Sequence, residues 1–213
     1  MPELLIFDWD GTLCDSLARI ALCLQLSAAD VGLPPPSVAA ARNIVGLGLD
    51  EVMRELFPGV DAATTTKLRA SYSLHFIRED STPSAFFPGV RTHLEKLRGQ
   101  GFSLAVATGK SRKGLDRVLE AVGMQSFFHS TRCADETASK PHPAMLFSLL
   151  DEFGVAPESA LMVGDTSYDM EMARAAQVPR LAVSYGAHCR ERLLEYQPLA
   201  CIDEFTAIDA LLI

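Results

Sequence analysis

Apolar and polar residues are arranged along the chain in two alternating patterns. Short continuous apolar runs, each ended by Gly, Pro or a polar turn, are typical of strands buried on both faces of a sheet. Between these runs, apolar residues recur with helical spacing. Strands that alternate with helices indicate an α/β fold, in which a parallel sheet is covered by helices on both faces. The predicted strands are 4–7, 102–107, 159–163 and 179–183, with a weaker one at 127–133, and the predicted helices are about 89–99, 112–122, 142–153 and 168–176.

The stretch from residue 15 to residue 82 interrupts this alternation. It contains no convincing strand, and its apolar spacing predicts several amphipathic helices, interrupted by prolines at 34–36 and by a loop at 45–48. The simplest topology is an α/β core formed by residues 1–14 and 83–213, with residues 15–82 inserted as a helical domain. The alternative is that these helices extend the core itself.

The composition narrows the class of protein. Of the 213 residues, 48% are hydrophobic and 22% are charged, as in a globular chain long enough to bury a core. The net charge of −8 argues against binding to nucleic acid or to an anionic membrane surface, although a local pocket can still bind a small anion. The first residues lack the features of a signal peptide, and no apolar stretch approaches the roughly 20 residues that span a bilayer. We therefore expect a cytoplasmic protein, either a monomer or a homodimer.

The cysteines argue against a disulfide framework or a structural zinc site. Their number is odd, and no two of them form a C-x-x-C pair. We expect reduced thiols that mostly fill the core. The five cysteines are Cys14, Cys23, Cys133, Cys189 and Cys201.

Two pairs of acidic residues follow predicted strands. Asp8 and Asp10 come directly after the first strand, and Gly11 then allows the backbone to turn close to a ligand. Asp165 follows a later strand, and Asp169 lies four residues further on, on the same side of a helix start. Carboxylate oxygens are the ligands that Mg²⁺ prefers. Taken singly, each pair also fits an ordinary turn or helix cap.

A hydroxyl group and a cation complete the set. Thr108 and Gly109 end another predicted strand before a helix, where a hydroxyl and free N–H groups can hold phosphate. Lys140 precedes two prolines in Lys-Pro-His-Pro, which fix its direction, and a fixed Lys is a point charge for a phosphoryl group. Alone, the first pair fits a helix cap, and Lys140 fits an ordinary surface lysine. Because the carboxyl ends of parallel strands meet along one edge, these groups can converge in one crevice suited to metal-assisted phosphoryl transfer.

With these four motifs in order, the sequence resembles the haloacid dehalogenase-like (HAD) hydrolase superfamily. The motifs are DWDGTL from Asp8, Thr108, Lys140, and GDTSYD ending at Asp169. The resemblance covers essentially the whole chain and implies a Rossmann-like α/β core with an inserted α-helical cap of the C1 type. The strings DGTLCDS, TGK, KPHP and YG look most like the phosphoglycolate phosphatase group, and related pyrophosphatases and sugar phosphatases share them.

The resemblance implies a Mg²⁺-dependent phosphatase that hydrolyses a small phosphate monoester through an aspartyl-phosphate. Asp8 would be the nucleophile, and Asp10 would protonate the leaving group and then take a proton from the attacking water. Thr108 and the Gly109 N–H would hold the phosphoryl group. Lys140 would orient Asp8 and offset negative charge.

The same resemblance implies a set of metal ligands and a moving cap. Mg²⁺ would be bound by Asp8, by the backbone carbonyl of Asp10 and by Asp165. Asp169 would be a further ligand or would hold a metal-bound water. The cap would close over the site and exclude water.

Residues of the cap and the nature of the substrate carry further expectations. Asp15 and Ser16 are expected to cap a helix or to form the hinge of the cap. Arg42 and the loop at 45–49 are expected to contact the substrate, the alternative being that Arg42 is a surface helix residue. The expected partner is a small phosphorylated metabolite. Phosphoglycolate, pyrophosphate, sugar phosphates and nucleoside monophosphates all remain open.

Other activities of the superfamily agree less well with the sequence. A 2-haloacid dehalogenase usually lacks the second aspartate, which is present as Asp10. A phosphonate hydrolase needs a cap lysine, and the presumed cap contains only Lys67. A phosphomutase or a pyrophosphatase stays open, because each keeps the same motifs. A non-catalytic binding or regulatory protein on this fold is the alternative from another class, and it would be expected to lose residues such as Asp8 or Lys140.

Overall fold

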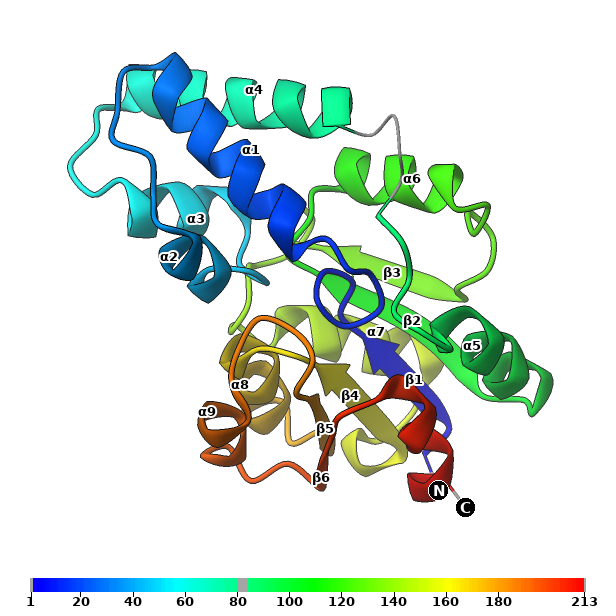
Figure 1. The fold of residues 1–213 in the computed structure, drawn as a ribbon. Helices are drawn as coiled ribbons and strands as arrows, with labels where there is room; N and C mark the ends of the chain where they lie inside the picture. Colours follow the sequence, from blue (N-terminus) through cyan, green and yellow to red (C-terminus); the bar gives the residue numbers. More distant parts are fainter. Residues whose placement is uncertain (1, 80–83, 213) are drawn as a thin grey trace.

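A computed structural model describes residues 2–79 and 84–212 (Figure 1). These residues form a six-stranded sheet in the order β3-β2-β1-β4-β5-β6, and every neighbouring pair is parallel. The fold is therefore the predicted α/β architecture. The strands are β1 (Leu4–Phe7), β2 (Ser103–Thr108), β3 (Ser130–Cys133), β4 (Ala160–Gly164), β5 (Arg180–Val183) and β6 (Ala200–Ile202).

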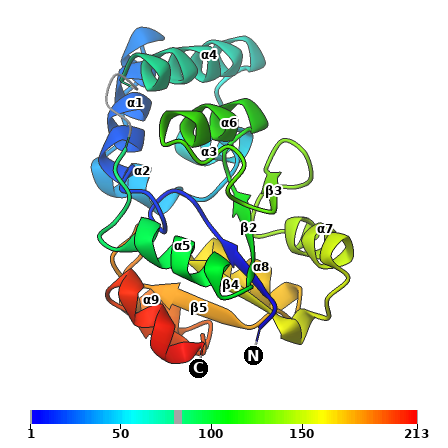
Figure 2. The same cartoon turned by 90° about the vertical axis from the view of Figure 1, so that its right-hand side faces the viewer.

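The central strand β1 explains why the sheet is covered on both faces. All four of its residues are fully buried, and successive side chains point to opposite faces. Leu5 and Phe7 pack with apolar residues of α5 and α6, whereas Leu4 and Ile6 pack with those of α7 and α8. Figure 2 shows these helices around the sheet. The helices that follow the insertion are α5 (Val90–Gly99), α6 (Arg112–Ala121), α7 (Ala144–Phe153), α8 (Ser167–Ala175) and α9 (Arg190–Leu194).

Residues 17–79, called here the helical insertion, contain only helices and loops. They form an apolar cluster of their own, in which Leu24, Met53 and Leu68 are buried. In Figure 1 the insertion lies beyond the arrowheads of β1 and β4, over the carboxyl edge of the sheet. The predicted boundary between residues 82 and 83 falls outside the described residues. The helices are α1 (Leu17–Asp30), α2 (Val38–Asn43), α3 (Leu49–Leu56) and α4 (Ala62–Glu79).

The strand order places a reversal between β1 and β4, since the chain adds β2 and β3 on one side of β1 and β4 to β6 on the other. Ligands bind at such a reversal, outside the carboxyl ends of the strands. Phe7 pairs with Val163 in register, and the N–H of Asp8 donates to the carbonyl oxygen of Val163 at 3.0 Å. The first residues after β1 and β4 are thereby brought together.

Among the described residues, none of the helices has the length and apolar character required to cross a membrane.

Candidate active site

Three buried aspartates meet at the reversal in strand order. Asp8 follows β1, Asp165 follows β4, and Asp169 lies in the first turn of α8. One carboxylate oxygen from each lies within 4.8 Å of the others. Asp169 is fixed by a capping box, because its Oδ2 accepts from the Thr166 N–H at 3.0 Å while the Thr166 hydroxyl accepts from the Asp169 N–H.

Lys140 lies against two of these carboxylates. Its Nζ is 2.6 Å from Asp8 Oδ1 and 2.6 Å from Asp169 Oδ1, and the residue is 1% exposed. Burial lowers the pKa of Lys140, but the charges of Asp169 and Asp8 outweigh it and raise that pKa above its ordinary value. The ammonium group is therefore charged at neutral pH, and it holds Asp8 and Asp169 in place.

Asp165 is held by the turn after β1 and by the loop after β5. Its Oδ1 accepts from the Thr12 hydroxyl at 2.8 Å, and its Oδ2 accepts from the Ala187 N–H at 2.7 Å. Gly11 has a φ of +83°, and a Cβ there would lie 2.2 Å from Asp165 Oδ2, so a side chain cannot fit. Burial, reinforced by the charge of Asp169, raises the pKa of Asp165 to about 7.

The donor set fits a hard divalent cation. Within the part of the chain that the structure describes, Asp8 Oδ2 is buried and has no hydrogen-bond partner. Burial raises the pKa of Asp8 well above its ordinary value, and although Lys140 opposes this, the charges of Asp169 and Asp165 add to it. One ammonium group offsets only one of three buried carboxylates. A cation with oxygen ligands, such as Mg²⁺, would offset the remaining charge.

Asp10 lies beside this cluster, and its carboxylate is not one of the three that converge. Its Oδ1 accepts from the Ser16 hydroxyl at 2.5 Å, and its Oδ2 lies 2.9 Å from Lys110 Nζ. Ser16 does stand at the start of α1, but its side chain caps none of the helix N–H groups that the structure describes. The backbone of Ser16 has φ −114° and ψ 0°, whereas a residue whose side chain caps a helix adopts extended backbone angles, and the hydroxyl of Ser16 instead holds Asp10. Asp15 is exposed, and its N–H donates to the Ala85 carbonyl oxygen at 2.9 Å.

Thr108 and Gly109 lie at the same edge of the sheet. Thr108 ends β2, is 1% exposed, and accepts from the Lys110 N–H at 3.2 Å. The cap of α6 is Ser111, whose hydroxyl accepts from the Gly114 N–H, so Thr108 is not the helix cap. Its hydroxyl is thus available at the carboxyl end of the strand next to β1.

Arg42 connects the helical insertion to the loop after β5. Its Nη2 donates to the Gly186 carbonyl oxygen at 2.8 Å, next to the residue that binds Asp165. The neighbouring Asn43 carbonyl oxygen lies 3.1 Å from both Tyr168 Oη and His188 Nε2. The structure thus places Arg42 at the contact between insertion and core.

Two core residues of this contact differ in how visible they were in the sequence. Tyr168 stands inside the fourth motif, whereas His188 belongs to no motif and was not predicted.

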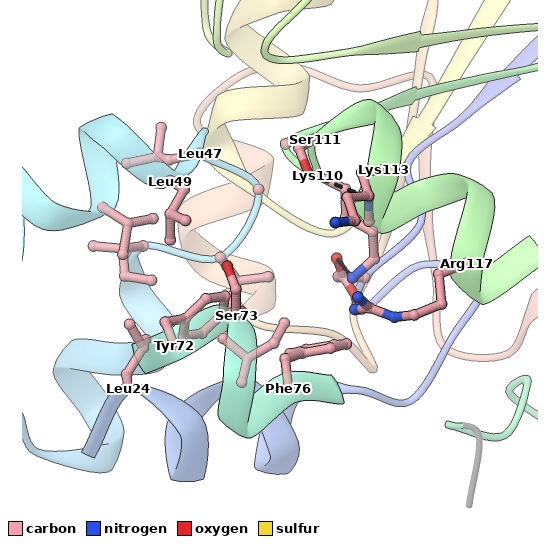
Figure 3. Close-up of a pocket in the computed structure, with 18 of the residues that line it drawn as sticks. Leu24, Leu47, Leu49, Tyr72, Ser73, Phe76, Lys110, Ser111, Lys113 and Arg117 are labelled. Carbon is pink, nitrogen blue, oxygen red and sulfur yellow. Dashed lines mark hydrogen bonds and ion pairs between the residues drawn. The ribbon is translucent and has the colours of Figure 1, made fainter. Parts of the chain in front are cut away.

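A cavity of about 220 Å³ opens beside Asp10, between the helical insertion and the start of α6 (Figure 3). The loop expected to contact substrate contributes Val45, Gly46, Leu47 and Leu49 to it. Of its other lining residues, the sequence motifs had included Asp10, Gly109 and Lys110, whereas the residues on α4 and α6 were not singled out. The signals were present as helical spacing, because Tyr72 and Phe76 lie four residues apart on α4 and Lys113 and Arg117 lie four apart on α6.

Comparison with known proteins identifies the family. Residues 5–183 match the family described as haloacid dehalogenase-like hydrolase. The chain is 35% identical to a protein named probable phosphatase IndB from Dickeya dadantii, over 98% of this chain and 92% of the relative. It is 33% identical to the phosphoglycolate phosphatase of Rhodospirillum rubrum, over 98% of this chain and 90% of the relative.

A solved structure agrees with these matches over the whole chain. The crystal structure of a predicted phosphoglycolate phosphatase from Haemophilus somnus 129PT superposes with a TM-score of 0.87 at 27% identity, and the alignment covers 100% of this chain and 98% of that one. Sequence and fold therefore agree, and the chain belongs to the haloacid dehalogenase-like hydrolase family.

Proposed function

We propose that the protein is a Mg²⁺-dependent phosphatase that hydrolyses a small phosphate monoester through an aspartyl-phosphate on Asp8. The observation that carries the proposal is the buried Asp8 carboxylate, held through Oδ1 by Lys140 while Oδ2 has no partner among the described residues. A nucleophile has to be oriented and also have a reactive oxygen available. The printed names of the relatives, phosphatase and phosphoglycolate phosphatase, support the same reaction class.

In the first step Asp8 attacks phosphorus, the ester P–O bond breaks, and Asp10 gives its proton to the departing alkoxide. In the second step water attacks the acyl-phosphate and loses a proton to Asp10, which releases inorganic phosphate and restores Asp8. The contacts of Asp10 with Ser16 and Lys110, at 2.5 and 2.9 Å, hold its carboxylate in one orientation. Thr108 and the Gly109 N–H hold the phosphoryl oxygens.

The ion would be held by Asp8, Asp165 and the backbone carbonyl of Asp10, and by Asp169 directly or through water. When bound, Mg²⁺ offsets the negative charge of the transferring phosphoryl group. Lys140 adds a second positive charge at Asp8. It also reduces the electrostatic repulsion between the carboxylates of Asp8 and Asp169, because its ammonium group contacts both of them.

The helical insertion serves as a cap, with residues 15–82 as the cap domain and residues 1–14 and 83–213 as the core. Its position over the carboxyl edge of the sheet supports this division (Figure 1). A closed cap excludes bulk water and macromolecules, so the partner is a small phosphorylated metabolite. The cysteines of the described chain are all free, which supports a cytoplasmic location.

Phosphate release from a panel of small phosphate esters tests the proposal, with millimolar Mg²⁺ or with EDTA. Wild type and the surface variant Asp151→Asn should release phosphate only with Mg²⁺, and Asp8→Asn should release none. Equal release by Asp8→Asn would show that the nucleophile is wrong. Turnover of a sugar monophosphate without phosphate release would indicate a phosphomutase instead.

A further inference from the structure

The cavity beside Asp10 lies where the leaving group of the proposed reaction would be. Asp10, Gly109 and Lys110 line it, whereas the described residues that line it do not include Asp8, Thr108 or Lys140. In the proposed mechanism the Gly109 N–H holds a phosphoryl oxygen and Asp10 faces the leaving-group oxygen, so the phosphoryl group lies at the end of the cavity formed by these two residues and the leaving group extends into the rest of it. The shape and chemistry of the cavity therefore report on the organic part of the substrate.

The cavity is larger than a very small leaving group requires. An apolar cavity of about 150 Å³ is enough to hold benzene. A cavity of about 220 Å³ therefore accommodates one ring and several further atoms. A two-carbon leaving group, such as that of phosphoglycolate, would leave most of this volume unfilled.

The wall that belongs to the helical insertion is apolar and partly aromatic. Tyr72 and Phe76 lie on successive turns of α4, with ring centroids 5.8 Å apart and ring planes inclined by 43°. Aliphatic side chains surround them and make the wall suitable for the face of a planar ring. The apolar lining residues include Ile20, Leu24, Leu47, Leu49 and Val52.

The opposite wall is positively charged. Figure 3 shows Lys110, Lys113 and Arg117 facing the insertion, Lys113 and Arg117 from α6 and Lys110 from the loop that precedes it. Lys110 Nζ lies 4.6 Å from the centre of the Phe76 ring, and the Arg117 guanidinium lies 5.6 Å from it. The described lining residues thus include three basic residues on this wall and one acidic residue, Asp10, which pairs with Lys110 at 2.9 Å.

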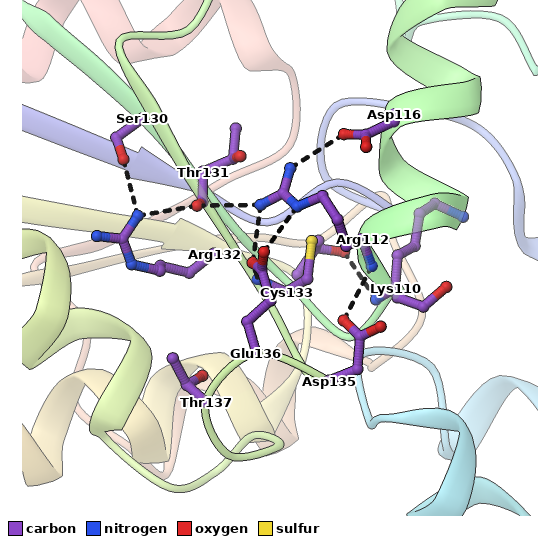
Figure 4. Close-up of polar contacts among 12 residues, drawn as sticks. Lys110, Arg112, Asp116, Ser130, Thr131, Arg132, Cys133, Asp135, Glu136 and Thr137 are labelled. Atoms are coloured by element: carbon purple, nitrogen blue, oxygen red, sulfur yellow. Dashed lines mark hydrogen bonds and ion pairs between the residues drawn. The ribbon is translucent and has the colours of Figure 1, made fainter.

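An ion-pair network fixes the start of α6, which carries this wall (Figure 4). Arg112 donates to both carboxylate oxygens of Glu136, at 2.9 and 2.8 Å, and to Asp116 at 3.1 Å. The Arg112 N–H donates to Asp135 Oδ1 at 2.9 Å. Bidentate pairs of this kind hold their partners in one geometry, so Lys113 and Arg117 are presented from a rigid helix.

We infer that the preferred substrate is a phosphate monoester whose leaving group carries an aromatic ring with an anionic substituent. The ring lies against Tyr72 and the aliphatic side chains of the same wall, and the anion meets Lys113 and Arg117. This inference depends on the proposed phosphatase reaction, because it assigns the cavity to the leaving group.

Three synthetic esters test the inference with wild-type protein and Mg²⁺: 4-carboxybenzyl phosphate, its neutral counterpart 4-carbamoylbenzyl phosphate, and 2-phosphoglycolate. The two benzyl esters differ in charge at a point remote from the reacting oxygen. We expect kcat/KM to be about tenfold higher for the carboxylate than for the amide, as charge-assisted hydrogen bonds allow. We expect the amide in turn to exceed phosphoglycolate by about tenfold or more, from apolar burial of the ring.

A pair of double variants locates the anion. Lys113→Gln with Arg117→Gln should remove the preference for carboxylate over amide, while turnover of the amide continues. Lys67→Gln with Arg98→Gln changes the same residue types outside the cavity and should keep the preference. A carboxylate preference that survives the first double variant in full overturns the placement of the anion.

The two failures can be told apart. If phosphoglycolate is the best of the three esters and its hydrolysis needs Mg²⁺ and Asp8, the phosphatase proposal stands and the inference about the leaving group is wrong. If no ester, including the general panel, releases phosphate, the proposed function itself fails and the inference fails with it.

Discussion

Replacing Lys140 by Met tests the electrostatic account of the site most directly. The side chain of Lys140 is fully buried, and its Nζ lies 2.6 Å from both Asp8 and Asp169. The variant keeps most of the side-chain volume but leaves three buried carboxylates without their cation. Removing one partner of a buried ion pair lowers the free energy of unfolding by about 3–5 kcal/mol. Solvent does not screen this interaction, because neither partner is exposed.

Urea unfolding in EDTA at neutral pH measures this effect. With a slope of about 2 kcal/mol per molar urea, a loss of about 3 kcal/mol moves the midpoint down by about 1.5 M. Lys96→Met is the matched control, since Lys96 is 50% exposed and pairs with Asp209 at 2.7 Å. Such a surface pair contributes about 0–1 kcal/mol. A Lys140→Met protein as stable as the control would refute the claim that the aspartate cluster depends on this cation.

Adding Mg²⁺ extends the same test. Binding to the folded state alone raises the free energy of unfolding according to ligand concentration and affinity. Because Lys140 and Mg²⁺ both offset the same carboxylates, Mg²⁺ should stabilise Lys140→Met more than wild type. Sodium chloride at equal ionic strength should not distinguish the two proteins. A larger gain for wild type would show that Lys140 does not share the charge of the aspartate cluster with the ion.

Further predictions concern the cap contact, the α6 network and the thiols. Gly109→Ala places a Cβ 2.4 Å from the Leu47 carbonyl oxygen, so kcat/KM should fall at least tenfold with little loss of stability, and unchanged activity would show that the contact is not needed. Hydrogen bonds from Arg112 lower the pKa of Glu136, so wild type should exceed Glu136→Gln in stability by about 1 kcal/mol near neutral pH. The difference should disappear as the pH falls through the lowered pKa, because stability from a depressed carboxyl pKa is present only above it; a constant difference would contradict this. Among the five cysteines, only exposed Cys189 should react rapidly with a disulfide reagent in the native protein, and a second fast thiol would contradict the described burial.

The sequence was most informative about the central strands. Leu4–Phe7 was predicted with its observed bounds, and the other buried strands were displaced by a residue or so at each end. These strands are buried on both faces and are therefore apolar throughout. β6, a three-residue strand at the sheet edge, and the short helix α9 were not predicted. Neither is long enough to show a periodicity.

The position of the site was predictable for a similar reason. Residues that directly follow strands of a parallel sheet meet at one edge, so the sequence alone brings Asp8 and Asp165 together. Which partner each side chain chooses was not predictable. Ser16 was expected to cap a helix or to form a hinge. Its side chain caps none of the described helix N–H groups, because its backbone is not in the extended conformation of a capping residue, and its hydroxyl donates to Asp10. The wall of the cavity on α4 depends on how the insertion packs, which no local pattern specifies.

The two lysines of the site show how this limit bears on function. Asp8 is paired with Lys140, which lies 132 residues away in the chain and has a side chain that is 0% exposed, whereas Asp10 is paired with Lys110, which is 11% exposed and lines the cavity. An ammonium group enclosed by two carboxylates cannot leave without exposing a buried charge, so Lys140 is fixed throughout the reaction. Lys110 has the cavity beside it, so its ammonium group can contact both Asp10 and an occupant of the cavity. The first motif therefore carries two acids of similar sequence context and different electrostatic roles, and the difference comes from the tertiary partners of each acid.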